Sequence, residues 1–115
     1  MRPPPPFSAS HALQDLRGNE RALRAMAAGF LETCQGALER AAQAQANGDA
    51  TALLHEVHSL RGSFAVLRAE TAREQAVAIH RELEAGRPAS QDSVDALLAE
   101  IVQLAAALRD WLDGR

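Results

Sequence analysis

The stretch LLHEVHSLRGSFAVL, residues 53–67, has the spacing of a helix with one apolar side. When about 100° of rotation is counted per residue, its large apolar side chains share a sector about 80° wide. These side chains are Leu53, Val57, Leu60, Phe64 and Leu67. His58 lies roughly 140° from the middle of that sector. The spacing therefore predicts a histidine on the outer surface of a helix whose opposite side is buried.

Two neighbours of His58 point to a phosphate group as its partner. Arg61, three residues on, projects a fixed positive charge, and a guanidinium neutralises and hydrogen-bonds phosphoryl oxygens. Gly62, four residues on, costs a helix about 1 kcal/mol relative to alanine, which is this chain's usual helix residue. A glycine there leaves space beside the imidazole. The alternative for Gly62 is a notch into which a neighbouring helix packs.

The rest of the chain predicts helices joined by short connections. The expected helices are a short one over residues 8–16, then residues 19–46, 49–68 and 70–85, and a last one from Ser90 onward. Short connections make consecutive helices antiparallel neighbours. We expect an all-α protein, an antiparallel up-down four-helix bundle with a short extra N-terminal helix, over residues 8–115. Four consecutive prolines make residues 1–7 an expected proline-rich disordered tail.

Composition limits the kinds of partner. The chain has 115 residues, enough for one domain, and a formal net charge of −3, which argues against nucleic acid. It has no apolar run of about 18 residues and no leader pattern, so we expect a cytoplasmic protein with no membrane contact. The single cysteine, Cys34, excludes an internal disulfide and is expected to be buried.

The run from Val57 to Ser63, with Gly48-Asp49 and Leu53 before it, resembles the His-x-Leu-Lys-Gly-Ser core of histidine phosphotransfer (HPt) domains. These domains carry phosphoryl groups between aspartates in two-component phosphorelays. The resemblance extends over nearly the whole chain. It implies that His58 is phosphorylated on Nε2, that Arg61 fills the lysine position, and that Gly62 clears space for a docking receiver domain.

Two further histidines are candidate contacts for phosphate or receiver. The family pattern places a glutamine or glutamate at the position of His80, so the resemblance implies that His80 orients the His58 ring or helps to hold the phosphoryl group. The alternative is a solvated histidine at the rim of the apolar face. His55, one turn before His58, is a weaker candidate with exposure as its alternative. Arg68 stands where the family often has a glycine.

The implied function is that of a bacterial phosphocarrier, not an autonomous enzyme. It would accept a phosphoryl group from one receiver aspartate and pass it to another, with receiver domains and a sensor or hybrid histidine kinase as partners. No cofactor is expected on this chain, and Mg²⁺ is expected on the receiver.

Two alternatives remain from the sequence. One is an interaction module that docks a receiver or kinase without accepting phosphate. The other is a metal site made by His55, His58 and His80. The chain lacks the Glu-x-x-His pairs typical of metal sites in helical bundles, and Arg61 would repel a cation.

Overall fold

The computed structural model describes residues 4–114, and within them every regular element is a helix. The helices are α1 (Ala9–Asp15), α2 (Glu20–Ala46), α3 (Ala50–Leu67), α4 (Glu70–Glu84) and α5 (Gln91–Leu112). None of the described helices combines the length and the apolar character that a bilayer-spanning helix requires. The expected all-helical fold is confirmed.

Three of the long helices begin where the sequence predicts, each directly after a residue whose side chain caps it. The side chains of Asn19, Asp49 and Ser90 each accept a hydrogen bond from the backbone N–H three residues on. Such a cap satisfies one of the backbone donors that the first helical turn leaves unpaired. Between α2 and α3, Gly48 has a φ of +65°, a conformation that favours glycine. These local interactions set where the helices start and turn.

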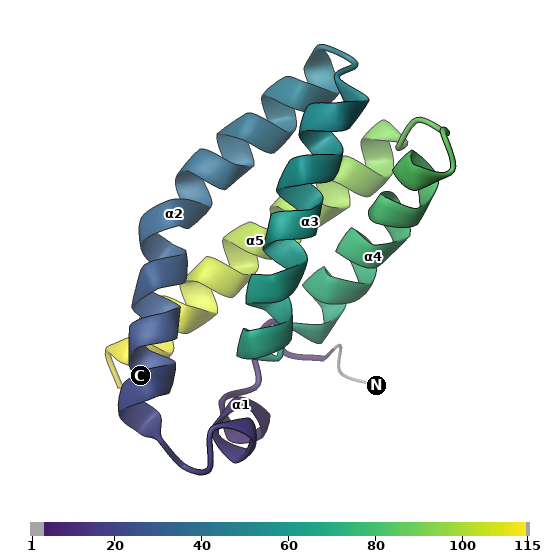
Figure 1. The fold of residues 1–115 in the computed structure, drawn as a ribbon. Helices are drawn as coiled ribbons and strands as arrows, with labels where there is room; N and C mark the ends of the chain where they lie inside the picture. Colours follow the sequence, from purple (N-terminus) through teal and green to yellow (C-terminus); the bar gives the residue numbers. More distant parts are fainter. Residues whose placement is uncertain (1–3, 115) are drawn as a thin grey trace.

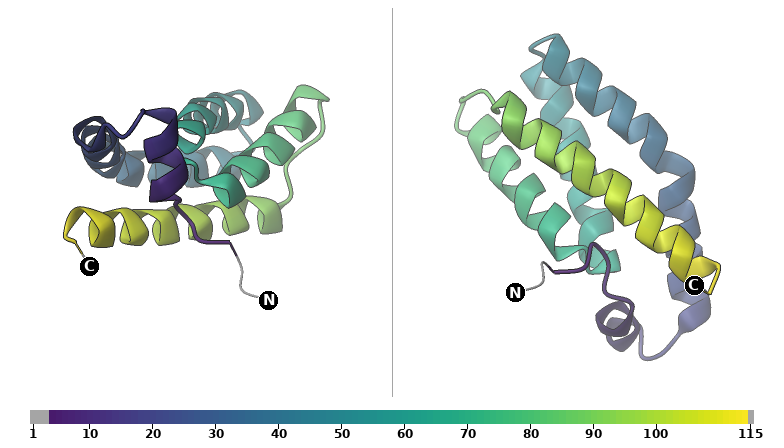
Figure 2. Two further views of the ribbon diagram at one scale, coloured as in Figure 1. Left: turned by 90° about the horizontal axis from the view of Figure 1, so that it is seen from below. Right: turned by 180° about the vertical axis from the view of Figure 1, so that it is seen from behind.

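The four long helices form a ring around one core (Figures 1 and 2). Helix α3 packs against both α2 and α4, and α5 packs against the same two helices from the opposite side. The short helix α1 crosses one end of the bundle, where it contacts α2 and α3. The expected up-down bundle with a short extra N-terminal helix is therefore present.

The core contains the apolar side of α3. Its five predicted inward side chains are all buried, and Phe64 and Val57 are completely enclosed. Cys34 on α2 is also buried, as expected. Because this side of α3 faces inward, the side that carries His58 faces solvent.

Phe7 does not belong to a disordered tail, which is what the sequence predicted for residues 1–7. Phe7 is only 8% exposed, and its ring packs edge-on against Trp111 near the end of α5, with the ring centroids 5.5 Å apart. Arg24 of α2 lies over the same Trp111 ring, 5.4 Å from its centroid. Phe7 therefore belongs to the packed domain. Of the rest of the expected tail, residues 1–3 lie outside the described part of the chain.

Arg68 connects α1 to the end of α3. Its Nε and Nη2 atoms donate hydrogen bonds of 2.7 and 2.8 Å to the two carboxylate oxygens of Asp15. Arg68 has a φ of +55°, a left-handed conformation that is unfavourable for a residue with a side chain. A glycine here would relieve the backbone but would remove this ion pair. The departure from the family pattern therefore gains a contact that positions α1.

The Asp15–Arg68 pair predicts a specific pH dependence of stability. The hydrogen bond from Arg68 holds the pKa of Asp15 below its ordinary value in the folded protein. A carboxyl group with a lowered pKa stabilises the fold above its unfolded pKa, and this stabilisation is lost as the pH falls through the folded pKa. We expect Asp15→Asn to have a lower melting temperature than the parent at neutral pH. The difference should disappear in acid, because the parent then loses the same charge. A difference that stays constant with pH would contradict this role of the pair.

Candidate functional site

His58 lies exposed on α3, on the side that faces away from the core. Its ring is close to that of His80 on α4, with centroids 5.5 Å apart and the planes at 62° in an edge-to-face arrangement. The hairpin formed by α3 and α4 therefore brings together two histidines that are far apart in the sequence. Of the two, His58 is the accessible ring, whereas the His80 side chain is only 13% exposed.

Arg61 joins the two helices at this point. Its Nη1 atom forms a hydrogen bond with Nδ1 of His80. The other ring nitrogen of His80, Nε2, lies 3.5 Å from Oε1 of Glu84, one turn further along α4. Sequence reasoning did not single out Glu84, although its spacing of four residues from His80 is that of a helical side-chain pair. The site thus contains His58, Arg61, His80 and Glu84.

Gly62 borders open space. A Cβ atom built at this position would meet no atom within 4 Å, once the helix's own backbone is set aside. No neighbouring helix therefore occupies the position, and the alternative of a packing notch is wrong. The glycine leaves the surface next to His58 unobstructed.

A groove between α2 and α3 begins at Gly62. It is lined by Met26, Gly29, Phe30 and Thr33 from α2 and by Gly62, Ser63, Val66 and Leu67 from α3. Met26 and Val66 are 37% and 43% exposed, which is high for large apolar side chains. The surface beside His58 is therefore partly apolar, and grooves of this kind are where proteins often contact partners.

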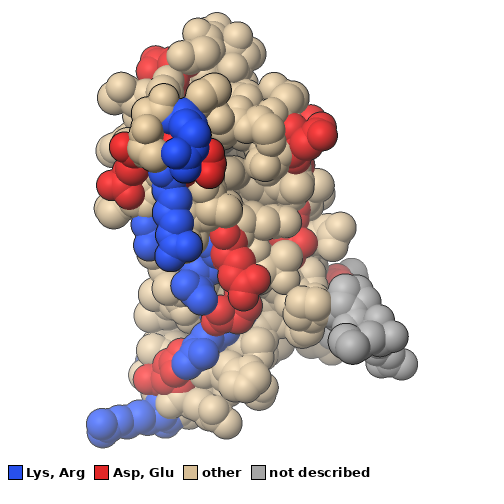
Figure 3. Space-filling view, turned by 90° about the vertical axis from the view of Figure 1, so that its right-hand side faces the viewer, with Lys and Arg blue, Asp and Glu red and all other residues tan. Residues whose placement is uncertain are grey.

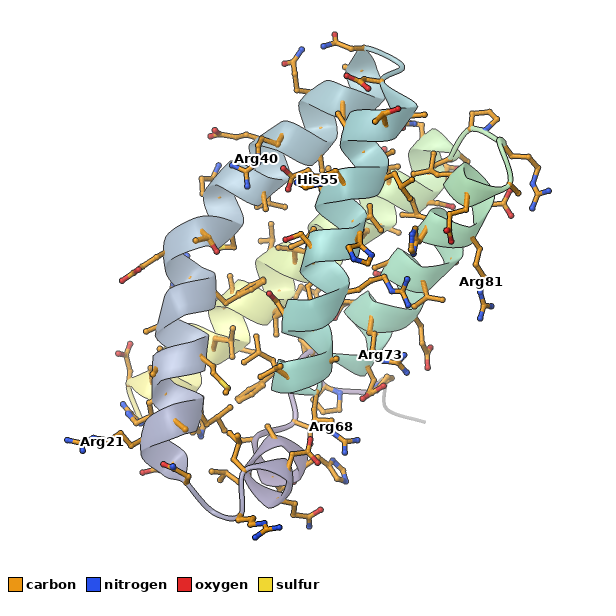
Figure 4. All side chains as sticks on the ribbon, viewed as in Figure 1. Arg21, Arg40, His55, Arg68, Arg73 and Arg81 are labelled. Carbon is orange, nitrogen blue, oxygen red and sulfur yellow. The ribbon has the colours of Figure 1, made fainter. Side chains whose placement is uncertain are left out.

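His55 does not join this cluster. It lines a different hollow, together with Arg40 and Glu56, and in Figure 4 it lies on the side of α3 that faces α2. Glu56 is the buried charged residue among those described, and its carboxylate pairs with Arg40. The three histidines that a metal site would need are thus not brought together. No group of three or more possible metal-ligating side chains occurs among the residues that the structure describes.

Arg61 has a histidine as its hydrogen-bond partner, whereas several arginines on this side of the bundle have carboxylates. The face of the bundle seen in Figure 3 carries a column of arginines with acidic side chains beside it. Arg68 and Arg73 pair with Glu70, and Arg87 pairs with Glu82, whose pKa its hydrogen bond lowers. Within residues 4–114, Arg61 forms no ion pair with a carboxylate, and its hydrogen bond goes to a histidine. Its positive charge is therefore not neutralised by a neighbouring acid.

Comparison with known proteins identifies the family. A family model described as the Hpt domain matches residues 25–111, which is most of the chain. The chain belongs to the Hpt domain family. Hpt domains act in histidine phosphotransfer within phosphorelays, and they interact with receiver domains and histidine kinases. The family predicted from the sequence is confirmed.

A solved structure supports the same fold. The crystal structure of the HPT domain from a sensor hybrid histidine kinase of Shewanella superimposes with a TM-score of 0.89 and covers 95% of each chain. The two sequences are 17% identical, so this likeness concerns the fold. A search of curated proteins finds no significant match.

The open space at Gly62 predicts that Gly62→Ala stabilises the Hpt domain. Alanine is favoured over glycine in a helix by about 1 kcal/mol, and the added methyl group would meet no neighbour. Urea unfolding followed by circular dichroism should show a higher midpoint. Gly48→Ala is the matched control, because that position is equally open but has a φ of +65°. It should lower the midpoint, and a lower midpoint for Gly62→Ala would contradict this description of the site.

Proposed function

We propose that this Hpt domain accepts a phosphoryl group on His58 from a receiver aspartate and passes it to the aspartate of another receiver. The observation that carries the proposal is the exposed His58 ring, beside a cation without an acidic partner and an open position at Gly62. A nucleophile on a surface of this kind can be reached by a second protein. The exchange is proposed to take place in the bacterial cytoplasm, with a sensor or hybrid histidine kinase upstream.

The transfer requires little chemistry from this chain. The lone pair of Nε2 of neutral His58 attacks phosphorus, and the bond from phosphorus to the aspartyl oxygen breaks. The electron pair leaves with the aspartate carboxylate, while the ring keeps its proton on Nδ1. Attack by a second carboxylate reverses these changes and restores neutral His58. Since such transition states are loose, position and charge supply most of the catalysis.

Arg61 and Gly62 fit this step in different ways. The guanidinium of Arg61, on the same helix and close to His80, supplies positive charge for the phosphoryl oxygens. Gly62 lets the partner's backbone approach, because any side chain would project into the space that the partner must enter. The groove that begins at Gly62 offers exposed apolar side chains on which a receiver can dock.

Phosphorylation should depend on His58 and not on its neighbour His55. We expect a ³²P-labelled receiver to label the parent chain and not His58→Gln. His55→Gln is the matched control, because it changes an exposed histidine on the same helix, three residues away, and should be labelled as the parent is. Equal labelling of His58→Gln would exclude His58 as the acceptor. Binding of the receiver without labelling of the parent would favour a docking module that carries no phosphate.

The role of Gly62 is tested by a larger side chain. Gly62→Gln should lower the rate of transfer from the receiver about tenfold or more, because a small misplacement of the reacting groups has a large effect on rate. The fold should be retained, since the new side chain points into open space. Ala28→Gln is the matched control, an exposed position on α2 that does not line the groove. An unchanged rate for Gly62→Gln would contradict the role given to this glycine.

A further inference from the structure

The hydrogen bond between Arg61 and His80 fixes the tautomer of His80. A guanidinium has only donors, so Nδ1 of His80 must be the acceptor in this contact. A neutral imidazole carries one ring proton, which must then lie on Nε2. That nitrogen faces the carboxylate of Glu84 at 3.5 Å, where an N–H group is favourable. Neutral His80 therefore holds Arg61 with one nitrogen and faces Glu84 with the other.

Protonation of His80 is incompatible with this arrangement. In the imidazolium both nitrogens are donors, so Nδ1 can no longer accept from Arg61, and the two cations repel. The groups that face His80 are His58 and Arg61 from α3 and Glu84 from its own helix. No charged side chain of α5 hydrogen-bonds or pairs with His80 in the described part of the chain. A protonated His80 would keep its pairing with Glu84 and release Arg61.

We propose that His80 is a positioning residue that holds Arg61 while His58 is unphosphorylated and takes up a proton from water when His58 is phosphorylated. The released Arg61 and the protonated His80 ring then both face the phosphoryl group. This inference rests on the proposed function of His58. It differs from one of the two roles that the resemblance implies for His80, that of orienting the His58 ring, because the hydrogen bond of His80 goes to Arg61 and not to that ring.

The geometry supplies the coupling between the two histidines. A phosphoryl group on His58 places negative charge beside a ring whose centroid is 5.5 Å away from that of His58. An opposite charge near a titratable group favours the charged form of that group. Imidazole is the side chain that ordinarily changes charge between about pH 5 and 8. Because phosphorylation is coupled to proton uptake at residue 80, this coupling by itself favours the phosphorylated state at lower pH, while protonation of the free His58 ring opposes it.

The test is an NMR titration of the full chain with ¹⁵N-labelled histidine, before and after phosphorylation by phosphoramidate. This donor transfers its phosphoryl group to the Nε2 of histidine, and ammonia leaves. Unphosphorylated His80 should show the tautomer with the proton on Nε2. After phosphorylation, the midpoint of the His80 titration should move up by about one pH unit or more. His58→Gln, treated in the same way, should show no movement.

A second variant separates the proton from the hydrogen bond. In His80→Gln the side-chain oxygen can still accept from Arg61, but the residue cannot take up a proton. The equilibrium of phosphotransfer from a receiver should therefore lose the part of its pH dependence that comes from proton uptake at residue 80, while the part that comes from His58 itself, the fold and the labelling of His58 are kept. A purely structural role for His80 would leave the pH profile of the variant unchanged from that of the parent.

The possible failures are distinguishable. If phosphoramidate does not label His58, both the proposed function and the coupling are overturned. If His58 is labelled and the His80 midpoint stays where it was, only the present inference fails. A proton found on Nδ1 of neutral His80 also overturns it, because that tautomer cannot accept from Arg61.

Discussion

Burial of the apolar side of α3 determines how every other residue of that helix is presented. The helix lies between α2 and α4, and five of its side chains are almost completely removed from solvent. Exposing any one of them would cost about 1.5–3 kcal/mol, so the rotation of α3 about its axis is strongly fixed. His58 faces solvent as a consequence. The apolar side chains on the opposite side of α3 set the direction of His58. Its ring is therefore accessible to a partner.

The second requirement is the packing of α3 on α4. The turn between them is closed by Arg68 in a left-handed conformation, and the antiparallel pairing places His80 beside His58. The site is therefore divided between two helices: α3 supplies the proposed nucleophile, the cation and the glycine, and α4 supplies the histidine that contacts the cation. A shift of one helix along the other would separate these groups while leaving both helices intact.

The sequence was sufficient for the features that depend on local spacing. Helix positions, three N-caps and the outward direction of His58 follow from periodicity and from side chains that act within one turn. The contact of Arg61 with His80 could not be predicted in this way, because it depends on side-chain conformations across two helices. The packing of Phe7 on Trp111 was not predicted, because the four prolines before Phe7 indicated a disordered tail. His55 lies on the same helix as His58, but at a different angle around the helix axis, and it therefore lines another hollow.

The central claim is that Nε2 of the exposed residue His58 is the point at which phosphate enters and leaves this Hpt domain. The most direct measurement is the one-bond coupling between ³¹P and ¹⁵N in the chain after a receiver has phosphorylated it, with only histidine nitrogens labelled. The account predicts one coupled nitrogen, and that it is Nε2 of His58. Coupling at Nδ1 of His58, at His80, or at no histidine nitrogen of a phosphorylated chain would contradict it.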